Sequence, residues 1–327
     1  MSKQTNHPIV HPIIVETRSS LLSVNFYLVQ TEQSLFLVDA GLPTEKCWHQ
    51  LNDVLQKNGW KIEDIQKIIL THNHHDHIGL VNRIRSHHHI PVYAHRDAVV
   101  RLQREPSFFN RRIDFFQALY SKMGCGKDGE KEVERLRKAT IKNKDDVLHG
   151  EISLLQEGDC LDGLQVVEVP GHAADHISLF HEGSGQLLAG DHLLQHISSN
   201  ALIEPDAQGQ MIPSLQLYET SLKKCLKLPM TVIYPGHGEV ITSPHELIKK
   251  RIDELDRKSA KIKRVVAEQA RTAAEVAQIY YPNKYKTEFS LVMSEIMGHL
   301  NRLQSLEQIS SEERGHIIYY RADDSFS

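Results

Sequence analysis

The sequence is poor in cysteine, and its cysteines are not paired. Only four occur among 327 residues, and no two of them form a CxxC pair. They are Cys47, Cys125, Cys160 and Cys225. Such wide spacing excludes the disulfide framework of a small secreted protein and indicates a reducing compartment. We therefore expect a cytoplasmic protein.

Long apolar runs and an excess of one charge are also missing. No segment approaches the roughly 20 apolar residues that a membrane-spanning helix requires, and residues 1–11 show neither an apolar signal core nor a positive leader. The formal net charge of -4 and the pI of about 6.6 give no general reason to expect nucleic acid or an anionic membrane as a partner. The hydrophobic content of 40% is ordinary for a globular protein. The length favours one large domain with a smaller second one.

Histidine, in contrast, is abundant, with 21 residues. The densest stretch is residues 72–77, which follows the short, apolar and β-branched run 68–70. This run predicts a buried strand, so the stretch would form a loop at a strand end. Four of its side chains can bind a metal, those of His72, His74, Asp76 and His77. The second cluster, His87 to His89, lies in a predicted turn and is interpreted as solvated.

Strand-like and helical segments alternate through the first 245 residues. Strand-like runs are found within 9–42, 68–70, 91–95, 152–189 and 231–234, and helical spacing is found at 46–58 and 214–228. Sheets with helices packed on their outer faces give such an alternation. The pattern therefore predicts an α/β layered fold.

Residues 97–145 have a different character, with many charges and few β-branched runs. We predict a helical insertion that is interrupted at 124–126 and again at Asp128-Gly129. A helix within it carries the aromatic residues Phe115, Phe116 and Tyr120 on adjoining faces. Two interpretations stay open, because these residues either pack in a core or belong to a lid over a site at the strand ends.

The C-terminal part of the chain is helical and charged. Segment 245–270 predicts one long helix or two, and Thr272 with Glu275 forms the pattern of a capping box. Another helix is predicted for 290–306, and 315–320 would be the second arm of a hairpin. Helices followed by a small hairpin are the order of a winged-helix module.

Three more possible ligands each close an apolar strand-like run. They are His172 after Val169-Pro170-Gly171, Asp191 after Leu188-Ala189-Gly190, and His237 after Tyr234-Pro235-Gly236. Each alone would be an ordinary loop residue. Together with the four in residues 72–77 they make seven imidazole and carboxylate ligands, which suit two divalent ions better than one. No cysteine is among them, which argues against a closed structural zinc site.

The ordered set of His72, His74, Asp76, His77, His172, Asp191 and His237 resembles the metallo-β-lactamase superfamily, and most closely its hydroxyacylglutathione-hydrolase-like branch. The resemblance covers about residues 10–245 and implies an αββα sandwich with a two-metal site at the edge between its sheets. It implies a first metal held by His72, His74 and His172. It implies a second held by Asp76, His77 and His237, with Asp191 bridging the two.

Two further positions bear on this resemblance. Asp39, in Leu37-Val38-Asp39-Ala40-Gly41, matches a recurring family position, either as a carboxylate that orients a ligand histidine or as a turn residue. Dinuclear β-lactamases have a cysteine where this chain has Asp191. That departure argues against the hydrolysis of antibiotics.

The C-terminal segment adds a resemblance to a subgroup that includes a mitochondrial β-lactamase-like endoribonuclease, the β-lactamase-like protein 2 type. We accordingly expect a catalytic domain at 1–245, with a helical insertion at about 97–145. A winged-helix-like domain would follow at 246–327.

These features predict a metal-dependent hydrolase that acts on a small ester, thioester or lactone. A hydroxide held by two divalent ions would attack the substrate, and Asp76 would align it and pass a proton to the leaving group. Zinc is the expected metal, and iron and manganese also accept these ligands. The expected partner is a small molecule, and a homodimer is compatible with the C-terminal segment. Candidates for substrate contact are Arg96, His176, Ser178, His192 and Tyr218.

Three other functions stay open. A ribonuclease would use the same metals with the C-terminal segment as an RNA platform, for which the basic stretch 249–264 is the local signal. A sulfur dioxygenase would use a single iron. A non-catalytic regulator with a structural metal is disfavoured by the open ligand set.

Overall fold

The computed structural model describes residues 7–322, which divide into two compact units. Unit 1 contains residues 7–103, 147–199 and 221–248, and unit 2 contains residues 104–146, 200–220 and 249–322. Helices α7 (Ser214–Cys225) and α8 (Pro244–Glu268) contribute residues to both units. Among the described residues, no helix is long and apolar enough to cross a membrane.

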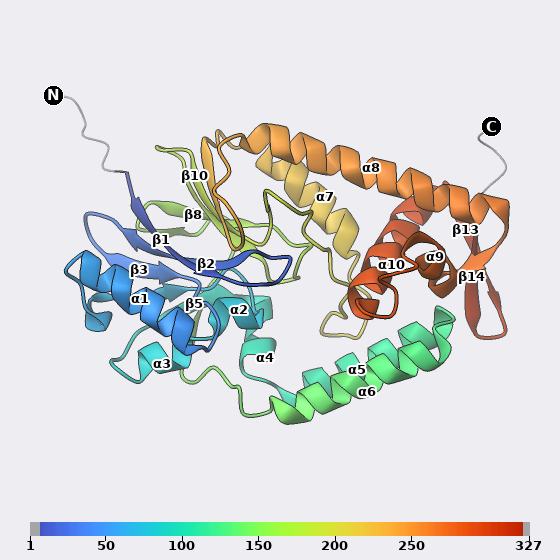
Figure 1. The fold of residues 1–327 in the computed structure, drawn as a ribbon, viewed down its shortest axis with the longest axis horizontal. Coiled ribbons are helices and arrows are strands. Elements are labelled where there is room, and N and C mark those ends of the chain that lie inside the picture. Colours follow the sequence, from blue (N-terminus) through green and yellow to red (C-terminus); the bar gives the residue numbers. More distant parts are fainter. Residues whose placement is uncertain (1–6, 323–327) are drawn as a thin grey trace. The chain divides into compact units, whose positions relative to one another are not determined.

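Unit 1 is built on a six-stranded sheet whose strands follow the order of the chain (Figure 1). The strands are β1 (Ile9–Glu16), β2 (Ser23–Gln30), β3 (Leu35–Val38), β4 (Ile68–Ile69), β5 (Val92–His95) and β6 (Ile152–Leu155). The first three pair antiparallel, and β3 to β6 pair parallel. Parallel pairing places the carboxyl ends of β3 and β4 at the same edge of the sheet.

A second sheet of unit 1 has five strands in the order β11-β10-β9-β8-β7. Their bounds are β7 (Cys160–Leu161), β8 (Leu164–Glu168), β9 (Ile177–His181), β10 (Gln186–Gly190) and β11 (Val232–Pro235). Only β10 and β11 pair parallel, while the other pairs are antiparallel. The carboxyl ends of β10 and β11 therefore also lie at one edge.

The alternation of side chains along β2 shows how the sheets are packed. Tyr27 and Val29 belong to a core shared with β8, β9 and β10 of the second sheet. Phe26 and Leu28 point to the opposite face, where they share a core with Leu51 of α1 (Glu45–Lys57). A strand with apolar residues on both faces is buried between two layers. This arrangement confirms the α/β layered fold.

Short helices connect the strands of unit 1. They are the 3-10 helices η1 (Ile62–Asp64) and η2 (Arg96–Ala98) and the α-helices α2 (His75–Ile78), α3 (Val81–Arg85) and α4 (Val99–Leu102). On the face of the second sheet, the end of α7 is anchored to β8, because Lys224 Nζ donates to the carbonyl oxygen of Glu168 at 2.6 Å.

Unit 2 has one apolar core that joins segments far apart in the chain. Its helices are α5 (Pro106–Lys122), α6 (Gly126–Lys142), α9 (Ala273–Tyr280) and α10 (Phe289–Ser305), together with most of α8. A small sheet has the order β12-β14-β13, formed by β12 (Arg271–Thr272), β13 (Ile309–Arg314) and β14 (Ile317–Ala322). Phe116 and Tyr120 pack in this core, so the interpretation of these two aromatic residues as core residues is confirmed.

The predicted capping box at the start of α9 is also confirmed. Thr272 Oγ1 accepts from the main-chain N–H of Glu275 at 3.2 Å, and Glu275 Oε2 accepts from the N–H of Thr272 at 2.8 Å. These bonds satisfy two of the donors that a helix start leaves unpaired.

The predicted interruption at Asp128-Gly129 is wrong, because α6 runs through both residues. Gly129 has a packing role instead. A Cβ at this position would lie 2.7 Å from Tyr120 Cβ and 2.9 Å from Cys125 Cβ. The glycine therefore allows α5 and α6 to approach closely. In the sequence, a glycine kept for close packing looks the same as one that breaks a helix.

We expect Gly129→Ala to lower the free energy of unfolding by up to about 2 kcal/mol. The overpacking cost of about 1–3 kcal/mol exceeds the gain in helix propensity of about 1 kcal/mol. Urea unfolding followed by circular dichroism measures the change. The control is Lys127→Ala at an exposed position of the same helix, which should change stability by less than about 0.5 kcal/mol. A stabilised Gly129→Ala variant would contradict the packing role.

Candidate metal centre

Four segments at strand ends bring the predicted ligands together in unit 1. The stretch 72–77, expected to be a loop, is helical from His75 on, because α2 begins there. Residues 72–77 follow β4, His172 lies between β8 and β9, Asp191 follows β10 and His237 follows β11. Their ligand atoms form three overlapping groups, in each of which the atoms lie within 4.8 Å of one another. The groups are His72, His74 and His172; His72, His77 and Asp191; and Asp76, His77 and His237. All seven residues predicted from the sequence therefore meet in one place.

The first group consists of three imidazole rings whose nitrogens converge. His74 Nδ1 lies 2.9 Å from His72 Nε2 and 3.0 Å from His172 Nε2. An N–H can point well at only one of its neighbours, so hydrogen bonds alone leave lone pairs facing each other. A cation at the centre would accept all three lone pairs. The geometry is that of a potential three-histidine metal site.

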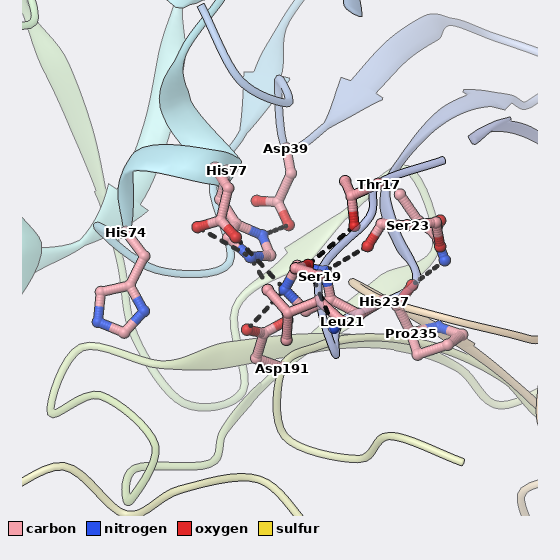
Figure 2. Close-up of polar contacts among 12 residues, drawn as sticks. Thr17, Ser19, Leu21, Ser23, Asp39, His74, His77, Asp191, Pro235 and His237 are labelled. Atoms are coloured by element: carbon pink, nitrogen blue, oxygen red, sulfur yellow. Dashed lines mark hydrogen bonds and ion pairs between the residues drawn. The ribbon is translucent and has the colours of Figure 1, made fainter. Parts of the chain in front are cut away.

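The carboxylate of Asp191 faces both ends of the cluster. Its Oδ1 is 3.4 Å from His77 Nε2, and its Oδ2 is 3.2 Å from His237 Nε2 and 3.5 Å from His172 Nε2. Asp76 Oδ2 lies 3.4 Å from His237 Nε2. Figure 2 shows the side chains of Asp191, His77 and His237 directed toward one another. One carboxylate thus faces three imidazoles, those of His77, His172 and His237.

Hydrogen bonds behind the rings determine which nitrogen faces the site. Asp39 Oδ2 accepts from His77 Nδ1 at 2.8 Å, and the carbonyl oxygen of Ser23 accepts from His237 Nδ1 at 2.7 Å. Carboxylate and carbonyl oxygens only accept, so both Nδ1 atoms carry a proton. The Nε2 atoms of His77 and His237 therefore point toward Asp191.

Asp39 also determines, through Thr71, which nitrogen of His72 faces the site. Asp39 accepts from the main-chain N–H of Thr71 and from its hydroxyl, each at 2.8 Å. The one hydroxyl proton of Thr71 is thereby committed, so Thr71 Oγ1 accepts from His72 Nδ1 at 3.1 Å. A single buried carboxylate thus orients two of the imidazoles, those of His77 and His72. These contacts support the orienting role considered for Asp39.

Burial and neighbouring charges shift the pKa values of these groups in opposite directions. Burial lowers the pKa of His72 well below its usual value, and the charges of His77 and His74 act in the same direction. Burial would also lower the pKa of His77, but Asp191 and Asp39 raise it well above its usual value. Burial would raise the pKa of Asp191, but His77 and His237 hold this pKa well below its usual value. The site is therefore built to hold positive charge between carboxylates.

Two polar atoms at the centre test whether a metal fits. His77 Nε2 and Asp191 Oδ1 are buried and face each other at 3.4 Å, and within residues 7–322 neither has a partner at good hydrogen-bond geometry. A buried polar atom left in this state costs on the order of 1–3 kcal/mol. Coordination of a divalent cation would remove this cost, and the donor set of imidazole and carboxylate suits zinc, iron or manganese. The residues present thus fit a divalent metal.

Other residues singled out in the sequence lie outside the three groups. His75 is exposed, and Asn73 Nδ2 donates to Asp175 Oδ1 at 2.6 Å. Four candidates for substrate contact are at most 1% exposed, which makes direct substrate contact the wrong role for them. They are His176, Ser178, His192 and Tyr218.

Apart from Asp39, the groups that contact the back of the ligand rings were not predicted from the sequence. Ser199 Oγ lies 3.0 Å from His172 Nδ1. Ser23 acts on His237 through its carbonyl oxygen, across 214 positions of sequence, and a main-chain group leaves no signal in the residue type. Thr71 directly precedes His72, and this adjacency is the signal that could have revealed it.

The comparison with protein families agrees with this geometry. The profile described as Metallo-beta-lactamase superfamily matches residues 20–237, more than half of the chain. The chain belongs to the metallo-beta-lactamase superfamily. Within it, the chain is 36% identical over 310 residues to the "Probable metallo-hydrolase YqjP" of Bacillus subtilis (strain 168), covering 94% of this chain and 96% of that protein. The chain is accordingly a metallo-hydrolase of this superfamily.

Two further members are similar over different lengths. The hydroxyacylglutathione hydrolase of Hahella chejuensis (strain KCTC 2396) is 27% identical over 186 residues, covering 55% of this chain and 50% of that protein. The crystal structure of a metallo-beta-lactamase family protein from Thermus thermophilus superposes with a TM-score of 0.78 at 24% identity, covering 96% of this chain and 98% of that one. The second similarity confirms the fold.

We expect Asp39→Asn to weaken metal binding about 10–100-fold, the usual effect of removing a group that orients metal ligands. An amide in place of the carboxylate cannot accept at both oxygen positions, so His77 and Thr71 lose fixed partners. Titration of chelator-treated protein with Zn²⁺ in a calorimeter measures the affinity.

The matched control for this variant is Asp162→Asn. Asp162 is also an aspartate of unit 1 with a positive φ of 50, and it pairs with Lys67 outside the site. This control should bind metal like the unaltered protein. Unchanged affinity in Asp39→Asn would show that Asp39 is a turn residue only.

Proposed function

We propose that this metallo-hydrolase binds two divalent metal ions, with zinc favoured, and hydrolyses a small ester, thioester or lactone. The observation that supports this most is the position of Asp191, whose two oxygens face different imidazoles of the cluster. A carboxylate placed in this way suits two ions better than one. His72, His74 and His172 would hold the first ion, Asp76, His77 and His237 the second, and Asp191 both.

Asp76 is the residue best placed for proton transfer. When bound, two such ions would bring the pKa of a water to about 7 and stabilise negative charge on the substrate. The side chain of Asp76 is 23% exposed, against 7% for Asp191. Burial would raise the pKa of Asp76, but His77 and His237 lower it below its usual value, so Asp76 is ionised at neutral pH. It can align the attacking water, accept its proton and pass the proton to the leaving group.

The class of substrate follows from the ligand set and from one relative. Asp191 stands where dinuclear β-lactamases have cysteine, which argues against antibiotics. The similarity to a hydroxyacylglutathione hydrolase supports the thioester class. The other sequence predictions belong to the same proposal: a cytoplasmic location, a homodimer, a catalytic domain at 1–245 with an insertion at 97–145, and a winged-helix-like domain at 246–327.

Removal of the metal should abolish hydrolysis, and added Zn²⁺ should restore it. The measurement is elemental analysis of the purified chain, combined with assays on thioesters, lactones, phosphodiesters and RNA. Two metal ions per chain with esterase or thioesterase activity are expected. One iron per chain with oxygen uptake would instead indicate a sulfur dioxygenase and overturn the proposal.

Asp76→Ala should lower kcat on the substrate identified in that screen by about 10²–10⁴-fold, the range lost with a general acid or base. The control is His75→Ala, which alters the exposed neighbour in the same short helix, α2, and should leave kcat unchanged. Full activity of Asp76→Ala would refute the mechanism.

An endoribonuclease is the second candidate, and a row of basic residues on α8 favours it. Lys250, Arg257, Lys261 and Arg264 are exposed, and their spacing places them on one side of the helix. Asp253 and Asp256 are exposed among them and reduce the positive field. For this reason the small-molecule hydrolase comes first.

The leading proposal expects no salt-dependent binding of a single-stranded RNA of mixed sequence, measured by fluorescence anisotropy. Binding that weakens with salt and is lost in Lys261→Glu/Arg264→Glu would favour the ribonuclease. Lys122→Glu, an exposed lysine of α5, is the matched charge reversal. Equal loss in both variants would mean that net charge alone attracts the RNA.

A further inference from the structure

His176 lies beneath the cluster without contributing a ligand atom to its three groups. It ends the turn that carries His172 and directly precedes β9. Its Nε2 accepts from the main-chain N–H of Asp191 at 3.0 Å. Its ring stacks on that of His72, with centroids 4.7 Å apart and planes inclined by 23°. The buried side chain of His176 therefore connects the turn that carries His172 with the segments that carry His72 and Asp191.

The hydrogen bonding of His176 is unusual for a residue that only fills space. Because Nε2 accepts from Asp191, the proton of a neutral ring is on Nδ1. In the part of the chain that the structure describes, this Nδ1 is buried without a hydrogen-bond partner. An apolar ring would fill the same volume without that cost. The feature that an apolar ring could not replace is the acceptor at Nε2.

The main chain around Asp191 has little room to adjust. A Cβ at Gly190 would lie 2.9 Å from His176 Nε2 and 2.6 Å from Thr71 Oγ1, and Gly190 has a φ of +50. A Cβ at Gly236 would lie 2.3 Å from Asp191 Oδ1. Asp191 is therefore held from two sides, by His176 at its main chain and by Gly236 at its carboxylate. Loss of the acceptor would leave a buried N–H unpaired, and relief of that cost requires this segment to move.

We propose that His176 is a positioning residue that fixes Asp191 between the two metal ions. The inference rests on the proposed function, because it concerns the same pair of ions. His176 does not touch the substrate, since it is 1% exposed. It acts through Asp191, the carboxylate that faces both sets of imidazoles, so its loss should affect the loading of the ions before it affects any later step.

Three substitutions of His176 separate the acceptor from the ring. His176→Gln places an amide oxygen near the position of Nε2 and keeps the acceptor, whereas His176→Asn places it near Nδ1 and loses it. His176→Phe keeps an aromatic ring to stack on His72 and has no acceptor. The control for the loss of a buried, hydrogen-bonded histidine is His299→Phe in unit 2, where His299 Nδ1 pairs with Ser259 Oγ at 2.8 Å.

The measurements are Zn²⁺ affinity by competition with a chromogenic chelator, metal content per chain, and thermal unfolding of the metal-free proteins. We expect His176→Asn and His176→Phe to bind Zn²⁺ about 10–100-fold more weakly, with His176→Gln and His299→Phe close to the unaltered protein. The Co²⁺-substituted proteins should show altered visible spectra in the same two variants. If His176→Phe does not fold, the comparison of His176→Asn with His176→Gln still tests the role of the acceptor.

Unaltered affinity and spectra in His176→Asn would overturn the positioning role while leaving the proposed function intact. Equal weakening in His176→Gln and His176→Asn would also overturn it, because the acceptor would then not matter. If the unaltered chain binds no divalent metal, the proposed function fails, and this inference fails with it.

Discussion

The metal centre depends on one buried carboxylate, that of Asp39. It accepts from the main chain and hydroxyl of Thr71 and from His77, and Thr71 passes the constraint on to His72. Asp39 has a φ of 59, a conformation that aspartate adopts more readily than most residues. Asp39 thus fixes the direction of the backbone after β3. It also fixes which nitrogen carries the proton in the rings of His72 and His77. A disturbance at Asp39 reaches His77 directly and His72 through Thr71, so the positions of these two rings are coupled.

The sheets place the remaining parts of the site. Strands β4, β10 and β11 each pair parallel with a neighbour, and their carboxyl ends carry residues 72–77, Asp191 and His237. A polar loop placed there is supported by strands whose side chains are almost fully buried. Hydrogen bonds between the sheets, such as that from the main-chain N–H of Asn25 in β2 to the carbonyl oxygen of Gly236 at 2.8 Å, hold the segment after β11 against the first sheet. The packed sheets therefore hold the segments that carry the ligands in fixed positions.

The sequence was sufficient for the elements and ligands that have a signature in residue type. Thr272 with Glu275 predicted a helix start, and histidines and aspartates after apolar runs predicted the ligand set, because such residues are rare at those positions by chance. What could not be predicted depends on main-chain atoms or on neighbours in space. The carbonyl of Ser23, the N–H of Asp191 and the close approach at Gly129 have no such signature. For the same reason the sequence suggests substrate contact for His176, whereas the structure buries it against the main chain of Asp191.

The order of the ligands along the chain has a consequence for folding. His77 and His237 follow strands of different sheets and lie in one ligand group, so the complete ligand set exists only in the folded chain. A ligand that binds the folded state alone stabilises it in proportion to the logarithm of its concentration, by about 4 kcal/mol at a thousand times its dissociation constant. A bound metal would therefore hold the two sheets together, and the stability of the folded chain would depend on the metal concentration around it.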